Sequence, residues 1–72
     1  MSVENARAFL TIFTEKPTVR TQLYVLSPRT IDDFIRFAHS KTGFAFSKDD
    51  LKAALREFNT PSANEVKQRF SL

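Results

Sequence analysis

The amino-acid sequence predicts an all-α fold, a compact bundle of four short helices with a short C-terminal helix after it. Apolar residues recur at three- and four-residue spacing, as they do along one face of an α-helix. One glycine and three prolines divide the 72 residues into segments of helical length. Alternation with a period of two never persists, and no Asn-Gly or Asp-Gly hairpin turn occurs, so strands are not expected.

The first helix is expected over residues 3–15 and the second over residues 17–26. Ser2 is a suitable N-cap for the first helix. Pro17 ends it, because the residue before a proline disfavours the helical region, and the same proline suits the first turn of the next helix. The predicted buried faces are Val3, Ala6, Phe9, Leu10 and Phe13 in the first helix, and Val19, Leu23 and Leu26 in the second.

The third helix is expected from Pro28 to Lys41. Ser27 is its predicted N-cap, with Pro28 in the first turn. Gly43 follows as the stop signal, since glycine adopts the left-handed conformation of a helix end most easily. The predicted buried face consists of Ile31, Phe34, Ile35 and Ala38.

The fourth helix is expected after Ser47, with a length of about eleven residues. Ser47 and Asp50 have the spacing of a capping box, and so do Ser62 and Glu65 at the start of a short fifth helix. The predicted buried faces are Leu51, Ala54, Leu55 and Phe58 in the fourth helix, and Ala63, Val66 and Phe70 in the fifth.

One hydrophobic core is expected, because a chain of this length has no room for two. We divide the chain into a main helical domain, residues 1–58, and a C-terminal tail, residues 59–72, that carries the short amphipathic helix. Phe46 lies in a predicted loop, where exposure would forgo about 1.5–3 kcal/mol of burial. We therefore expect Phe9, Phe34, Phe46 and Leu55 to be buried together.

The sequence lacks the residue types that several kinds of functional site need. The chain has no cysteine, which removes disulfides and thiolate ligands, and a single glycine, which excludes a glycine-rich phosphate loop. His39 is the only histidine, and Asp32-Asp33 and Asp49-Asp50 fall in helix first turns, where the helix dipole favours negative charge. We expect no enzymatic activity, no catalytic residues, no cofactor and no metal.

The charge and the apolar runs bear on partners and location. Eleven Lys and Arg against eight Asp and Glu give a net charge of +3, but no two of these cations are adjacent in sequence. Phosphate binding needs several cations on one face, so we expect a protein partner rather than nucleic acid. No apolar run exceeds three residues and the N-terminus lacks a signal-peptide pattern, so we expect a cytoplasmic protein without membrane contact.

A candidate partner-binding surface follows from the helical wheels. Ile12, Tyr24, Val25 and Phe37 fall outside the apolar stripes of their helices, and apolar residues left outside a small core often mark an interface. Of these four, we choose Ile12 and Phe37 for the interface. Lys48, Lys52 and Arg56 follow at four-residue spacing and form a basic ridge beside the stripe of the fourth helix. We predict that these five residues contact another protein, with self-association as an alternative.

Residues 2–55 resemble the Nif11-like domain. The resemblance rests on residues 6–10 (Ala-Arg-Ala-Phe-Leu), on Pro17 with Leu23, and on Ala38 followed by residues 43–51, a glycine, two aromatics, Ser47, an acid and Leu51. This family is known from small proteins near nitrogen-fixation genes. It is also known as the leader segment of some ribosomally made, modified peptides.

The resemblance implies a non-catalytic module that binds another protein, as leader-type relatives bind their modifying enzymes. Lys16 stands where the family favours Asp, and the chain has neither the paired glycines nor the cysteine-rich core peptide of leader-type members. We therefore interpret the chain as a stand-alone Nif11-like domain. The alternatives are a leader-like precursor remnant recognised by a peptide-modifying enzyme, a weak nucleic-acid-binding regulator, and an orphan whose motifs serve folding alone.

Overall fold

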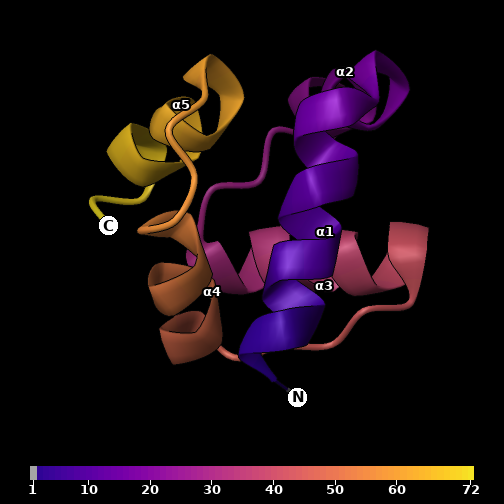
Figure 1. The fold of residues 1–72 in the computed structure, drawn as a ribbon. Coiled ribbons are helices and arrows are strands. Elements are labelled where there is room, and N and C mark those ends of the chain that lie inside the picture. The colour runs from indigo at the N-terminus through magenta and orange to yellow at the C-terminus, as the bar shows by residue number, and fades with distance from the viewer. Residues whose placement is uncertain (1) are drawn as a thin grey trace.

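Five α-helices follow one another in the structure, a computed structural model that describes residues 2–72. The α1 helix lies at the centre of the bundle and packs against α2, α4 and α5 (Figure 1). Phe9 and Phe13 of α1 contact Phe34 of α3. The described residues contain no strand, so the predicted all-α class is confirmed. The helices are α1 (Val3–Glu15), α2 (Pro17–Leu26), α3 (Ile31–Thr42), α4 (Lys48–Leu55) and α5 (Pro61–Arg69).

The first two helices have the predicted bounds. The Ser2 hydroxyl accepts a hydrogen bond from the backbone N–H of Asn5, which caps α1. The last turn of α1 contains no basic residue, and its carbonyls are bound instead from α2. Arg20 donates to the carbonyl oxygens of Phe13 and Thr14 at 2.8 and 2.7 Å. One guanidinium therefore fixes the angle between the two helices.

The predicted start of the third helix at Pro28 is wrong. Ser27 is the C-cap of α2 in a left-handed conformation (φ 48°, ψ 62°), and its N–H donates to the carbonyl of Leu23. Thr30 is the N-cap of α3, where its hydroxyl accepts from the N–H of Asp33. Because Ser27 reverses the chain, Pro28 becomes a buried loop residue rather than the first turn of a helix.

Two predicted signals around α3 and α4 are confirmed. Gly43 ends α3 with a left-handed φ of 79°. Ser47 and Asp50 form a full capping box, in which each side chain binds the other residue's backbone N–H. However, α4 has eight residues rather than eleven. The α-helical hydrogen bonds stop after Leu55, where the backbone N–H of Phe58 donates to the carbonyl of Leu55, three residues earlier.

The capping box predicted for α5 is not formed. Thr60 is the N-cap, with its hydroxyl accepting from the N–H of Ala63, and Pro61 occupies the first helical position. The Glu65 carboxylate faces α2 instead, where it accepts a hydrogen bond from Tyr24. The cap lies two residues earlier than predicted because a proline at the first helical position needs no backbone donor.

The core is built around phenylalanine rings. The rings of Phe9 and Phe34 meet edge to face at 5.6 Å between centroids, and those of Phe9 and Phe46 lie 5.8 Å apart. Phe9, Phe34, Phe46 and Leu55 are each at most 1% exposed, so the predicted group is confirmed. The loop residue Phe46 fills the core between α1 and α3, as its burial energy requires.

Two predicted exposures are reversed. Leu26, expected on the buried face of the second helix, is 61% exposed, whereas Phe37, expected outside the core, is only 5% exposed. Leu26 is the last residue of α2, and the reversal at Ser27 directs the chain away before any helix covers it. Phe37 is covered at the junction of α2 and α3. Among the described residues, no helix has the length and apolar character needed to cross a membrane.

Candidate functional site

The exposed apolar surface is concentrated at the end of α2. Within residues 2–72, the large hydrophobic side chains that remain exposed are Tyr24 (44%), Val25 (79%) and Leu26 (61%). Their neighbour Leu23 is buried, since α2 has one face against the bundle and successive residues turn by about 100°. We call these three exposed residues the α2 tip.

A groove of about 400 Å³ opens beside the α2 tip. Its apolar part comes from Leu26 at the end of α2, from Pro28 in the following loop and from Phe37 on α3. Phe37 forms the floor, because it is almost wholly buried, and Leu26 forms an exposed wall. We call this the α2–α3 groove, and its lining is Leu26, Ser27, Pro28, Arg29, Asp33, Arg36, Phe37 and Ser40.

The polar lining of the α2–α3 groove carries an excess of positive charge. Arg29 and Arg36 are both exposed, and Asp33 is the single carboxylate. Among the described residues, the one ion pair joins Arg7 to Glu57, so neither groove arginine is bound to a carboxylate there. Both guanidinium groups are therefore available to a charged ligand.

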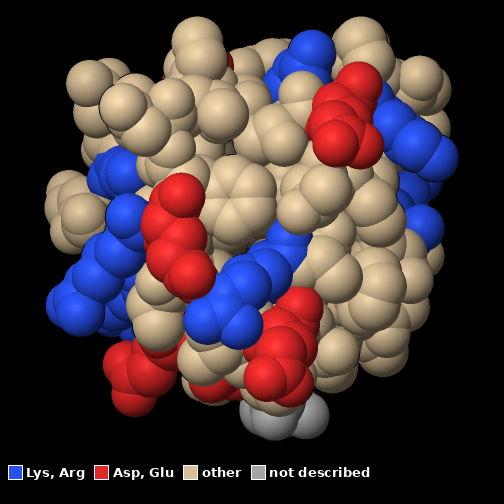
Figure 2. All heavy atoms as spheres, in the orientation of Figure 1, with Lys and Arg blue, Asp and Glu red and all other residues tan. Residues whose placement is uncertain are grey.

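The predicted basic ridge lies elsewhere. Lys48 and Lys52 are exposed on α4, and Arg56 is exposed directly after it. Figure 2 shows Lys and Arg side chains on the side of the molecule where α4 lies. Lys52 and Arg56 line a hollow of about 190 Å³, which we call the basic hollow. The α5 helix adds Lys67, whose ammonium also donates to the carbonyl of Phe58 at 2.9 Å. The apolar lining of this hollow is Leu55 and Leu72.

The five predicted residues do not form one surface. Phe37 lines the α2–α3 groove, while Lys52 and Arg56 line the basic hollow. Ile12 is half-buried on α1 and lines neither of them. The sequence contained a signal for the α2 tip, the apolar run at residues 24–26 directly before Ser-Pro. The helical wheel placed Tyr24 and Val25 outside the apolar stripe of their helix, whereas the exposure of Leu26 depends on how the chain turns after α2.

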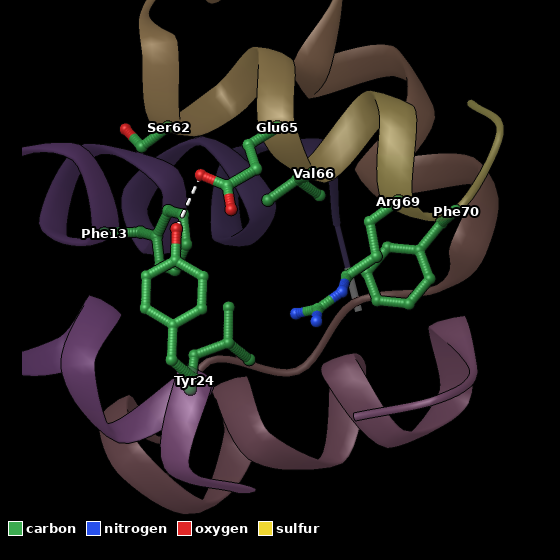
Figure 3. Close-up of a pocket in the computed structure, with 8 residues that line it drawn as sticks. Phe13, Tyr24, Ser62, Glu65, Val66, Arg69 and Phe70 are labelled. Carbon is green, nitrogen blue, oxygen red and sulfur yellow. Dashed lines mark hydrogen bonds between the residues drawn. The ribbon is translucent and has the colours of Figure 1, made fainter. Parts of the chain in front are cut away.

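A third hollow lies between α1, α2 and α5, and it is a packing seam. Figure 3 shows Tyr24 of α2 directed toward Glu65 of α5, and the Tyr24 hydroxyl donates to the Glu65 carboxylate at 2.5 Å. This hydrogen bond, with a smaller effect of desolvation, raises the pKa of Tyr24. The enclosed space is about 10 Å³. That volume holds about one water molecule, so no larger ligand fits there.

The polar and charged side chains of the described residues lie at or near the surface. No polar or charged side chain between residues 2 and 72 is buried. Over the same range, no three His, Cys, Asp or Glu side chains are grouped to hold a metal ion. What the molecule offers a ligand includes an apolar tip, a groove with two arginines, a separate basic hollow, and an open hollow of about 450 Å³ lined in part by Arg20, Tyr24 and Glu65.

The fold and these surfaces define a small helical domain with one exposed apolar end. Residues 1–51 match the family model of the Nif11 domain, and the chain therefore belongs to the Nif11 family. Comparisons with curated proteins and with solved structures give no match. The α2 tip and the α2–α3 groove lie inside the matched residues, whereas the residues of the basic hollow all lie after them.

Proposed function

We propose that the chain is a non-catalytic protein-binding module, and that its partner binds at the α2 tip and the α2–α3 groove. The observation that carries this proposal is the exposure of Val25 and Leu26, at 79% and 61%, beside a groove with an apolar floor. Burying one such side chain against a partner contributes about 1.5–3 kcal/mol. A short contact at this end of the molecule thus has a substantial apolar driving force.

Membership of the Nif11 family favours a second, more specific function, that of a leader-like segment recognised by a peptide-modifying enzyme. Leader-type relatives bind such enzymes, and the resemblance to them implies the same kind of partner for this chain. Both functions require a protein to bind the helical domain. They differ in whether that protein then acts on a peptide joined to the domain. The chain needs no disulfide to fold, which suits the reducing cytoplasm as its proposed location.

A further alternative, a weak nucleic-acid-binding regulator, is supported by the basic hollow with Lys52, Arg56 and Lys67. Three cations on one side of the molecule are suited to a phosphate backbone. Lys67 is partly engaged by the carbonyl of Phe58. The groove and the basic hollow therefore make different predictions about which positions contact a ligand.

Site-specific photo-crosslinking in the source cells tests the proposal. A photoreactive phenylalanine analogue replaces Val25 in one variant and Lys52 in the other, since both residues are exposed. We expect a discrete protein adduct from position 25 that disappears when Leu26→Ser is added. Adducts from position 52 alone, or adducts with nucleic acid, would place the binding site at the basic hollow and overturn the proposal.

A further inference from the structure

We infer that the α2–α3 groove recognises an acidic segment of its partner, one in which carboxylates flank an apolar side chain. The inference rests on the proposed function and specifies the chemistry of the partner at that site. Three properties of the groove carry it: the apolar floor, the two arginines beside it, and the repulsion that a second copy of this chain would meet.

The apolar floor sets the first requirement. Phe37 lies at the bottom of the groove, and Leu26 and Pro28 border it, so the least costly occupant of this position is an apolar side chain. The volume of about 400 Å³ falls in the range of small ligand pockets. Leu26 can gain further burial from the same contact, because more than half of its surface is exposed.

The arginines set the second requirement. Arg29 comes from the loop and Arg36 from α3, so two different segments each place an arginine in the lining of the groove. A guanidinium binds a carboxylate through two parallel hydrogen bonds, which makes this pairing both strong and directional. Asp33 supplies one negative charge, and the lining keeps a net positive charge. A carboxylate beside the apolar side chain would complement that charge.

The charges also decide against a second copy of this chain as the occupant. A two-fold dimer formed through the groove would place groove against groove, so that four arginines, two from each copy, would share one interface with only two Asp33 carboxylates. Each copy carries a net charge of +3, and like charges across an interface cost several kcal/mol. An acidic segment of a different protein meets no such repulsion.

Titrations followed by ¹H–¹⁵N NMR test this inference on the full chain. The probe is a short synthetic peptide in which glutamates flank a pair of leucines. One matched peptide has lysines in place of the glutamates, and another has serines in place of the leucines. We expect the glutamate peptide alone to shift the amides of Leu26, Arg29 and Phe37 in a saturable way.

Two charge-reversal variants give the control within the protein. Arg36→Glu removes a groove cation and is expected to weaken binding about tenfold, the effect of losing one charged hydrogen-bonded pair. Lys52→Glu makes the same change of net charge in the basic hollow and is expected to leave the affinity within about twofold, since exposed charges are screened over about 10 Å. Both residues are exposed, so both variants are expected to keep the wild-type melting curve.

Several outcomes would overturn the inference. They are equal binding of the lysine peptide, equal weakening by the two variants, shifts confined to the basic hollow, no saturable shift with any peptide, and concentration-dependent shifts at Leu26 without peptide. If a protein adduct at position 25 is found together with any of these results, the proposed function is retained and only the inference of an acidic partner segment is rejected. Absence of that adduct removes the proposed function itself.

Discussion

The two links on either side of α3 are built from similar parts and have opposite effects. Each begins with a left-handed residue, Ser27 or Gly43, and each ends with a hydroxyl N-cap, Thr30 or Ser47. The α3–α4 link, residues 43–47, directs Phe46 into the core. The α2–α3 link, residues 27–30, leaves the preceding apolar residue exposed at the surface.

This difference shows that one short link places its own aromatic residue in the core, while the other leaves the apolar residue directly before it at the surface. Phe46 contacts Phe9 of α1 and is 1% exposed, so the α3–α4 link stabilises the fold. Leu26, directly before the α2–α3 link, is 61% exposed beside an open groove, so its side chain contributes little to folding, whereas Pro28 within the link is buried. Substitutions in the two links should therefore separate stability from binding.

The largest effect is expected for Phe46→Ala. Removal of a buried phenylalanine costs about 3–5 kcal/mol through lost burial and the cavity that remains. A domain of this size is stable by only about 3–5 kcal/mol in total. Circular dichroism should show loss of the cooperative thermal transition. An unchanged melting curve would mean that the α3–α4 link does not support the core.

A smaller effect is expected for Gly43→Ala. The φ of Gly43 is 79°, and a Cβ at this position meets no atom within 4 Å, so the cost comes from the backbone conformation alone. That conformation costs a non-glycine residue about 1–2 kcal/mol. Urea denaturation should show a loss of this size in the free energy of unfolding. Ser27→Gly is the matched control, because it relieves the same conformation in the other link. Equal destabilisation by both changes would contradict this account.

The smallest effect on stability is expected for Leu26→Ser. Substitutions of exposed residues usually change the free energy of unfolding by less than about 0.5 kcal/mol. Phe37→Ser, on the floor of the same groove, is expected to unfold the domain because the side chain is buried. The melting curves of the two variants test this contrast. Strong destabilisation by Leu26→Ser would show that the α2 tip belongs to the core.

The parts of the fold predicted well from the sequence are those with local signals. Ser2 and Pro17 fix the bounds of α1 and the start of α2 through conformations that depend on neighbouring residues only. The predicted start of α3 was wrong because Ser27 and Thr30 are both good N-caps. The choice between them depends on the left-handed turn at Ser27, which serine adopts only where the surrounding structure holds it.

The candidate site was predicted less well, because it is formed between helices. A helical wheel describes the faces of one helix, so it does not show that Phe37 and Leu26 line the same groove or which of them is covered. It did place Lys52 and Arg56 on one side of α4, where both line the basic hollow. The addition of Lys67 to that hollow depends on how α5 packs, which no local pattern contains.

The packing of α5 has a consequence for substitutions elsewhere in the chain. The Nif11 match ends at residue 51, yet Ala63 and Val66 are buried, and the ring of Phe70 lies 5.5 Å from that of Phe34 in α3. A substitution at Phe34 therefore alters the surface on which Phe70 packs. The matched and unmatched parts of the chain share one core, so a substitution in either part must be accommodated by the other.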